Sequence, residues 1–425
     1  MGGETITPPT FTSEDEPSVD QDFPLPSLFS QNPTLVRDDL GMKVEHGKEE
    51  VDRLLYEEFG QLAPQFSSSA SLEFEADDKR RHNVYKEVLH SYYQLQVRST
   101  SLNEVKSKVL SYVPGAWIEN VGGMKSADYD VPKTTALLLI GPKGCGKSSL
   151  VNKISRVFED DKFAPERAQV SFNLSAGDGT CYLQEYMIPR GSASFCLYDS
   201  RSLCNDTSDN INMIKCWMTK GVRHEELVVR KSDQSSLRRR MKCKTRERSW
   251  KSCETRMVNF VIFVVDGITV LKSMEGDGPD ETQYMEMITR AFMCPYLSFK
   301  DDKPAVVITH GDLLSLADRV RVRVHLGELL GIPPAKQIFD IPDSHDPATE
   351  LTIVDMLRYS LEHADRNLPR KNWVYKVFLS ACTYLLAMLG IAIVAAYVKH
   401  LKMRHAHKSE FHIDWHAIRH MWLED

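Results

Sequence analysis

The sequence lacks the short, regular cysteine spacings of metal sites and disulfide frameworks. Its nine cysteines are scattered from Cys145 to Cys382, and no two of them form a C-x-x-C pair. Structural zinc sites and disulfide-stabilised domains both need such spacings. The pattern is typical of reduced thiols in a cytosolic domain. The N-terminus also lacks a basic start followed by an apolar core, so we expect no signal peptide.

No charge of one sign dominates the 425 residues. The chain has 53 basic and 59 acidic residues and a net charge of −6, which argues against general nucleic-acid binding. This average hides an asymmetry, because residues 1–50 are rich in Asp, Glu and Pro while residues 215–256 are strongly basic. We predict a disordered acidic and proline-rich region over residues 1–76. Apolar residues at three- and four-residue steps then predict a helical extension over residues 77–130.

Long uncharged apolar runs are absent with one exception near the carboxyl end. Residues 378–398 form a stretch of 21 residues without a charge. As a helix this stretch is about 31 Å long, close to the thickness of a bilayer core. Basic residues flank it on both sides, and tyrosines lie near its ends, as in membrane-interface regions. We predict a transmembrane helix over residues 374–398 and a short tail over 399–425; a buried core helix is the alternative.

The position of this run predicts how the protein is inserted. The 27 residues after Val398 (399–425) are too few for the run to leave the ribosome before synthesis stops. We therefore expect a tail anchor, with the remainder of the chain in the cytosol, where nucleotides and Mg²⁺ are available. The charge rule does not decide the orientation, because both flanks are basic.

What the sequence does contain is a glycine-rich phosphate-loop motif. Residues 141–148 read G-P-K-G-C-G-K-S and fit the pattern G-x-x-x-x-G-K-[ST]. An apolar run predicts a strand over 134–140, and helical spacing predicts a helix over 148–159, the context in which such a loop binds phosphate. The alternative is a chance match in a glycine-rich turn. The predicted nucleotide-binding residues of the loop are Gly141, Pro142, Lys143, Gly144, Cys145, Gly146, Lys147, Ser148 and Ser149. Lys147 would reach the β- and γ-phosphates.

Apolar strands alternate with helices over residues 131–366. Further strands are predicted at 181–188, 194–198, 259–265, 305–308 and 337–341, with helices at 279–293, 315–330 and 348–364. This alternation predicts an α/β fold in which helices cover both faces of a mostly parallel sheet. With the phosphate loop, it indicates a P-loop NTPase domain. Ligands bind at the carboxyl ends of the strands in such folds.

Three residues are candidates for holding Mg²⁺. Ser148 is the loop residue that ligates the ion in P-loop NTPases, and an acid at the end of a neighbouring strand supports it. Asp199 is the best candidate for that acid, and Asp266 is the runner-up, although a strand-end turn explains Asp266 better. Thr180 would complete the metal shell, but threonine in such a turn is usually only a turn residue. The predicted metal residues are Ser148, Thr180 and Asp199.

A second motif predicts which base is read. Thr309-His310-Gly311-Asp312 follows a buried apolar run. The carboxylate of Asp312 can accept hydrogen bonds from the N1–H and the exocyclic amine of guanine, whereas adenine lacks both donors in that arrangement. The alternative role for Asp312 is a cap of the helix that follows. The predicted ligand is GTP, and Thr309, His310 and Asp312 are its predicted contacts in this segment.

The phosphate loop, the segment ending at Asp199, the strand ending at Asp266 and the base-reading motif together resemble the interferon-induced 44-like GTPases. That family belongs to the wider translation-factor-like class of GTPases. The resemblance is carried by Leu137–Ser149, Phe195–Ser200, Phe260–Asp266 and Val307–Asp312. It covers about residues 130–365 and leaves out the N-terminal region, the basic insert and the membrane segment. The resemblance implies a Ras-like core that binds GTP.

The chain departs from the GTPase pattern at two places. It reads Asp199-Ser-Arg-Ser202 where most GTPases have Asp-x-x-Gly, so Ser202 replaces the glycine whose N–H senses the γ-phosphate, and no Gln follows to orient water. His310 stands where a lysine is usual, which alters stacking along the base. We predict slow hydrolysis, or a partner that supplies the missing group, and weaker switching. The alternatives are a catalytically inactive nucleotide-binding scaffold and an ATP-binding P-loop protein.

Two further segments leave several interpretations open. The basic insert at 215–256 lies in a long excursion between predicted strands, which is either functional or disordered. It could contact anionic lipid or a protein partner, contact nucleic acid, supply an arginine finger, or remain a solvated loop. In the tail, His412, His416 and His420 have the spacing of a zinc-binding helix face, but an amphipathic interfacial helix explains them without metal.

Overall fold

A seven-stranded sheet forms the centre of the chain. The computed structural model describes residues 53, 72–159, 165–170, 180–239, 254–276, 278–299, 302–371, 373–408 and 414–420. The strand order is β5-β2-β3-β1-β7-β8-β9. The strands are β1 (Thr135–Ile140), β2 (Tyr182–Ile188), β3 (Phe195–Asp199), β5 (Glu226–Leu227), β7 (Phe260–Asp266), β8 (Ala305–Thr309) and β9 (Ile338–Asp340). Two further strands, β4 (Val222–Arg223) and β6 (Thr255–Arg256), pair with each other in a small second sheet.

The sheet is mostly parallel, as the sequence predicted. Strands β3, β1, β7, β8 and β9 run in the same direction, whereas β2 is antiparallel to both β3 and β5. In the register, Leu139 lies beside Asp199 and Asp266 beside Thr309. The carboxyl ends of the parallel strands therefore bring both predicted motifs to one edge of the sheet.

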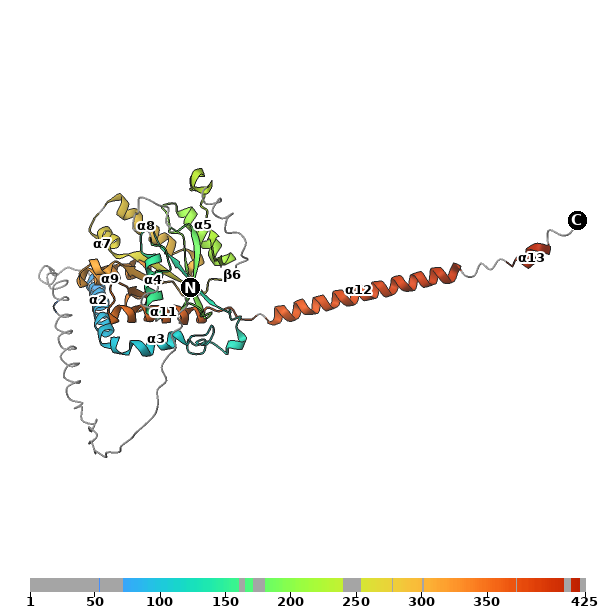
Figure 1. Cartoon of the computed structure of the whole chain (residues 1–425), viewed down its shortest axis with the longest axis horizontal. Coiled ribbons are helices and arrows are strands. Elements are labelled where there is room, and N and C mark those ends of the chain that lie inside the picture. The colour runs from blue at the N-terminus through green and yellow to red at the C-terminus, as the bar shows by residue number, and fades with distance from the viewer. Residues whose placement is uncertain are drawn as a thin grey trace, which may run out of the picture. The chain divides into compact units, whose positions relative to one another are not determined.

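Alternating side chains of the strands divide the interior into two hydrophobic cores. In β1, Leu137 and Leu139 belong to one core, whereas Ala136, Leu138 and Ile140 belong to the other. The first core is covered by α3 (Leu102–Leu110), α4 (Lys147–Phe158) and α11 (Pro347–Arg366). The second is covered by α5 (Thr207–Lys220), α7 (Gly267–Glu275), α8 (Pro279–Phe292) and α9 (Leu316–Leu330). Helices on both faces (Figure 1) explain the near-continuous apolar strands β1, β3, β7 and β8, because both sides of these strands are buried. The predicted α/β fold class is confirmed.

Helix α2 (Leu72–Arg98) packs along α9, α11 and the short helix α10 (Pro334–Gln337). Its Tyr92 hydroxyl donates a 2.7 Å hydrogen bond to Asp340 at the end of β9. The guanidinium groups of Arg319 and Arg323 lie 5.1 and 5.3 Å from the centre of the Tyr92 ring, within the range of cation–π attraction. The helix begins at Leu72 rather than near residue 77. The rest of the predicted acidic region lies outside the described residues, apart from Arg53.

Helix α12 (Trp373–Lys408) contains the predicted membrane segment. Within it, Val377–Arg404 is a candidate span of 28 residues; its most apolar 18-residue stretch has a mean hydropathy of 2.3, and none of that stretch is buried in protein. In the described part of the chain this is the one helix that is long and apolar enough to cross a membrane. The helix is longer than the predicted 374–398 because its basic residues continue the same helix.

Helices α5 and α7 were not predicted from the sequence. α5 occupies part of the excursion that was expected to be loop or insert. Its polar first turn is capped by Asp206, which accepts a 3.0 Å hydrogen bond from the Asp209 N–H. Met213, Ile214 and Trp217 provide the buried stripe that the sequence analysis missed. Residues 240–253, which include most of the basic cluster, lie outside the described residues.

Candidate nucleotide site

The loop at 141–148 connects β1 to the first turn of α4. Gly146 has a φ of +79°, which L side chains rarely adopt, and it precedes α4. Among the described residues no side chain caps this end of the helix, so the first N–H groups of α4 have no side-chain acceptor. A Cβ on Gly141 would lie 2.2 Å from the carbonyl oxygen of Val264. Glycine is required at both positions, and the helix end is suited to an anion.

Lys147 lies almost completely inside this loop, with 6% of its surface exposed. Its ammonium group donates hydrogen bonds to the carbonyl oxygens of Gly141 and Pro142, both at 3.0 Å, and to the hydroxyl of Ser202 at 3.1 Å. The Cys145 sulfur lies 3.8 Å away, and burial raises the pKa of this thiol. The lysine is therefore positioned by the loop itself and by the segment that follows β3.

The structure brings the three predicted metal residues together. The hydroxyls of Ser148 and Thr180 donate to the same carboxylate oxygen of Asp199, at 2.6 and 3.4 Å. Asp199 is 2% exposed, and its second oxygen has no hydrogen-bond partner among the residues described. Burial raises the pKa of this carboxyl, although Lys147 and the two hydroxyls act to lower it.

This donor set fits a hard cation such as Mg²⁺. Two hydroxyls and a carboxylate are all oxygen ligands, and Mg²⁺ usually binds one or two carboxylates together with phosphate oxygens and water. Within the described ranges, no three His, Cys, Asp or Glu side chains gather closely enough to hold a metal by themselves. The cluster therefore fits an ion that arrives with a phosphate ligand, and Ser148, Thr180 and Asp199 would hold it.

Thr309 and His310 lie beside the phosphate loop. The Thr309 hydroxyl is within hydrogen-bond distance of the carbonyl oxygens of Cys145 and Val265, at 3.0 and 3.1 Å. Thr309 is buried, and its contact with the Cys145 carbonyl oxygen supports the backbone of the loop. This contact ties the base-reading motif to the phosphate loop. The hydrogen bond from Thr309 to the Cys145 carbonyl oxygen therefore keeps residues 309–312 next to the phosphate loop.

Asp312 is exposed at the start of the segment after β8. One of its carboxylate oxygens accepts a 2.8 Å hydrogen bond from the backbone N–H of Asp343. Ser315, and not Asp312, caps α9, since its side chain accepts a hydrogen bond from the Asp318 N–H. The alternative role of Asp312 as the cap of that helix is therefore not what the structure shows. Its carboxylate stays at the surface, beside the edge of the sheet that carries the loop.

Asp266 forms an ion pair with His310 instead of joining the metal cluster. Its carboxylate lies 2.8 Å from Nδ1 of His310 and also caps α7 through the Ile268 N–H. The hydrogen bond to Asp266 raises the pKa of His310 in spite of partial burial. Burial pushes the pKa of Asp266 up, but the hydrogen bonds from His310 and Thr269 outweigh it, so the pKa is lowered. Asp266 thus has the structural role that the sequence favoured.

The sequence analysis missed how the segment after β3 contacts the loop. The Leu203 N–H donates to the Gly141 carbonyl oxygen at 2.9 Å, and the Ser200 hydroxyl donates to the Leu139 carbonyl oxygen at 2.6 Å. Ser202 had been noted only as a replaced glycine. No pattern in the sequence pairs a serine with a lysine 55 positions earlier, because the contact depends on the parallel register of β1 and β3.

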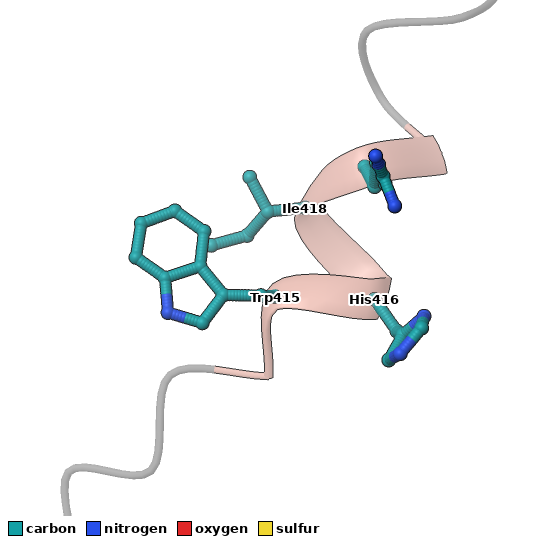
Figure 2. Close-up of a pocket in the computed structure, with 4 residues that line it drawn as sticks. Trp415, His416 and Ile418 are labelled. Atoms are coloured by element: carbon teal, nitrogen blue, oxygen red, sulfur yellow. The ribbon is translucent and has the colours of Figure 1, made fainter.

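The carboxyl-terminal helix α13 (Trp415–His420) carries a surface hollow of its own. Figure 2 shows Trp415 and Ile418 on one side of this short helix and His416 on the other, which suits the amphipathic interpretation of the tail. All the lining residues belong to one turn and a half of helix, so the hollow is no nucleotide site. The side chains of His412 and His420 lie outside the described residues, and the zinc interpretation is not tested.

Comparison with known proteins does not identify a family. No protein-family model matches the chain, and no curated protein matches its sequence. Among solved structures, the chain is similar to a signal recognition particle receptor SRb with GDP and Mg from Chaetomium thermophilum. The identity is 13% and the TM-score is 0.22, over 47% of this chain and 79% of that one. A likeness this distant carries no functional argument, and the resemblance to interferon-induced 44-like GTPases stays a prediction from sequence.

We predict that the imidazole of His310 titrates above its ordinary pKa of 6.5, because Asp266 stabilises the protonated ring. The contribution of this pair to stability should be complete below that pH and lost as the pH rises through the raised pKa. Replacing Asp266→Asn, which keeps a capping side chain, should lower the midpoint. Histidine NMR of the full chain in detergent measures the titration midpoint of the His310 imidazole. An unchanged midpoint would contradict the prediction; Asp318→Asn, on a carboxylate that contacts Ser315 and Arg321, is the control.

Proposed function

We propose that this protein binds guanine nucleotide with Mg²⁺ at the edge of the sheet and is held at a membrane by α12. The observation that carries the proposal is the arrangement around Asp199. Ser148 and Thr180 meet one oxygen of this buried carboxylate, and its other oxygen has no partner among the described residues. A buried unpaired carboxylate oxygen is costly, and a cation ligated by the neighbouring hydroxyls would offset that cost.

The phosphates would bind along the loop Gly141–Ser149. The N-terminal N–H groups of α4 and the ammonium of Lys147 provide the positive potential that a polyphosphate needs. Bound Mg²⁺ would neutralise phosphate charge at Ser148 and Asp199. Lys143 and Gly144 are exposed at the outer side of the loop, where a ligand can approach.

Guanine selection is proposed for Asp312. Its carboxylate is exposed, and the Asp343 N–H fixes the orientation of one oxygen. A fixed acceptor of this kind rejects a base that lacks matching donors, because the carboxylate would then stay unpaired. His310 lies two residues away and is held against Asp266, and we propose that it would lie at one side of the base. Adenine nucleotide binding is the alternative that this arrangement disfavours.

Slow hydrolysis accompanies this proposal. No Gln lies directly after the Asp199–Ser202 motif to orient water, and the Asp-x-x-Gly glycine is replaced by Ser202. A nucleotide-binding scaffold without turnover is the second candidate, and the same two features favour it. The role at the membrane is that of a switch or organiser on a surface. Contact of the basic insert with anionic lipid or with a protein partner belongs to this proposal as well.

Nucleotide titration tests the ligand. We expect the full chain, in detergent with Mg²⁺, to bind GTP and GDP at least about tenfold more tightly than ATP, the discrimination given by about 1.4 kcal/mol. Replacing Lys147→Ala should abolish binding, because the buried ammonium is the cation of the loop. Replacing exposed Lys125→Ala is the control and should change nothing. Tighter binding of ATP would overturn the assignment of Asp312, and no binding of any nucleotide would overturn the proposal.

Replacing Asp312→Asn should reverse the base preference. The amide keeps an oxygen for the Asp343 N–H but donates where the carboxylate accepted, so it should weaken GTP binding and favour xanthosine triphosphate, whose C2 carries an oxygen. Fluorescent nucleotide competition measures both. Rescue by the xanthine nucleotide separates base recognition from damage to the fold. Equal loss for both nucleotides would mean that Asp312 has only a structural role.

Membrane attachment predicts that the chain floats with liposomes only when α12 is present. The exposed apolar span Val377–Arg404 is long enough for the bilayer core. A chain ending at residue 371 should remain in the soluble fraction of a flotation gradient, whereas the full chain should float. The control replaces exposed apolar residues outside the span, for example Leu313→Ser. Flotation of the shortened chain would show that other surfaces bind the membrane.

A further inference from the structure

We propose that Ser202 makes this site select nucleoside diphosphate over nucleoside triphosphate, by occupying the face of Lys147 that a terminal phosphate needs. The inference rests on the proposed function and concerns the same loop. It is carried by three sets of contacts. These are the hydrogen bonds of Lys147, the pairing of residues 200–203 with the loop, and a clamp that we define as residues 228–233.

The hydrogen bonds of Lys147 leave its ammonium with no spare donor. An ammonium group has three N–H donors. Three oxygen acceptors lie 3.0 to 3.1 Å from its nitrogen, on Gly141, Pro142 and Ser202. Of the three, Ser202 alone is a side chain from outside the loop. A ligand phosphate that binds the ammonium must therefore replace one of these acceptors.

The number of phosphates decides which acceptor is lost. The lysine of such loops reaches both the β- and the γ-phosphate. A diphosphate needs one N–H donor of the ammonium, which becomes available when the hydrogen bond to one loop carbonyl breaks. A triphosphate needs two such donors. The second donor can come only from the bond to Ser202 or from the last loop carbonyl. Binding a triphosphate therefore breaks one more hydrogen bond of Lys147 than binding a diphosphate does.

The residues on either side of Ser202 are held by the loop and by β1. The Leu203 N–H donates to the Gly141 carbonyl oxygen, and Pro142 and Leu203 form an isolated parallel bridge. The Ser200 hydroxyl reaches the carbonyl oxygen of Leu139. These contacts extend the β1–β3 pairing past the ends of both strands. The segment is therefore part of the sheet edge rather than a free loop.

The clamp holds the same segment on the other side. Arg230 donates a hydrogen bond to the carbonyl oxygen of Ser202. Arg201, the residue before Ser202, donates two hydrogen bonds to the Asp233 carboxylate, at 2.6 and 2.7 Å. It donates a third to the Val228 carbonyl oxygen at 2.8 Å. Both partners of this ion pair are almost fully buried, with 4% and 5% of their side chains exposed. A bidentate buried pair of this kind fixes geometry strongly.

The clamp is itself anchored to α5. The Asp209 carboxylate accepts hydrogen bonds from the N–H groups of Lys231 and Ser232 and from the Ser232 hydroxyl, at 2.6 to 3.0 Å. The Asp233 carboxylate also accepts from the Arg230 N–H at 2.7 Å. Residues 200–203 are thus held between the phosphate loop and a clamp that lies within the basic insert. The backbone of Ser202 therefore cannot move away from Lys147 unless this whole arrangement rearranges, so the hydroxyl stays within reach of the ammonium.

The test measures the affinities of the full chain for GDP and for a non-hydrolysable GTP analogue, both with Mg²⁺ in detergent. We expect GDP to bind about tenfold more tightly, the size of one hydrogen bond to a charged group. Replacing Ser202→Ala removes the competing hydroxyl and should strengthen binding of the GTP analogue about tenfold, with little change for GDP. Replacing Arg230→Met loosens the clamp and should act in the same direction, with a smaller effect.

The matched control is Arg223→Met. Arg223 is an exposed arginine on β4 that contacts Thr255 and lies outside the clamp, so this variant should keep the wild-type ratio of the two affinities. Equal affinities of the wild type for both nucleotides would overturn the inference while leaving the proposed function intact. Weaker binding of the GTP analogue by Ser202→Ala would also overturn it, because Ser202 would then be a phosphate ligand. No binding of either nucleotide by the wild type would overturn the proposed function as well.

Discussion

The burial of one ammonium group constrains the site more than any other interaction. Lys147 is 6% exposed and surrounded by two loop carbonyls, a thiol and the Ser202 hydroxyl. A buried cation is tolerated only when its donors are all used. The loop therefore curls around the lysine, and the first N–H groups of α4 have no side-chain cap among the described residues. The same requirement ties the segment after β3 to the loop. The anion site and the segment that would sense its ligand are consequently a single unit.

Much of the fold follows from the sequence because it depends on patterns within short segments. The strand before the loop is uniformly apolar and is buried on both faces, so the parallel sheet and its helical layers could be predicted. The end of β3 at Asp199 was also predictable, since the apolar run stops there. The proximity of Asp199 to the loop follows from the rule that parallel strands end at one edge, whereas Thr180 joins them because β2 is antiparallel to β3 and starts at that edge.

The parts that could not be predicted depend on contacts between distant segments. Helix α5 begins with polar residues that read as a loop, and its buried stripe is short. The ion pair of Arg201 with Asp233 joins residues 32 positions apart, and no local pattern around either of them indicates burial. The same holds for Tyr92 and Asp340, which are 248 positions apart. Such pairs become visible only when the sheet order is known.

The central claim is that the loop around Lys147 holds the phosphates of a guanine nucleotide, with a cation at Ser148 and Asp199. An experimental structure of the full chain with GDP and Mg²⁺ tests it most directly. The account predicts the β-phosphate against the N–H groups at the start of α4 and the ion beside the hydroxyl of Ser148. Density for the nucleotide elsewhere on the chain, or an Asp199 carboxylate remote from the ion, would contradict it.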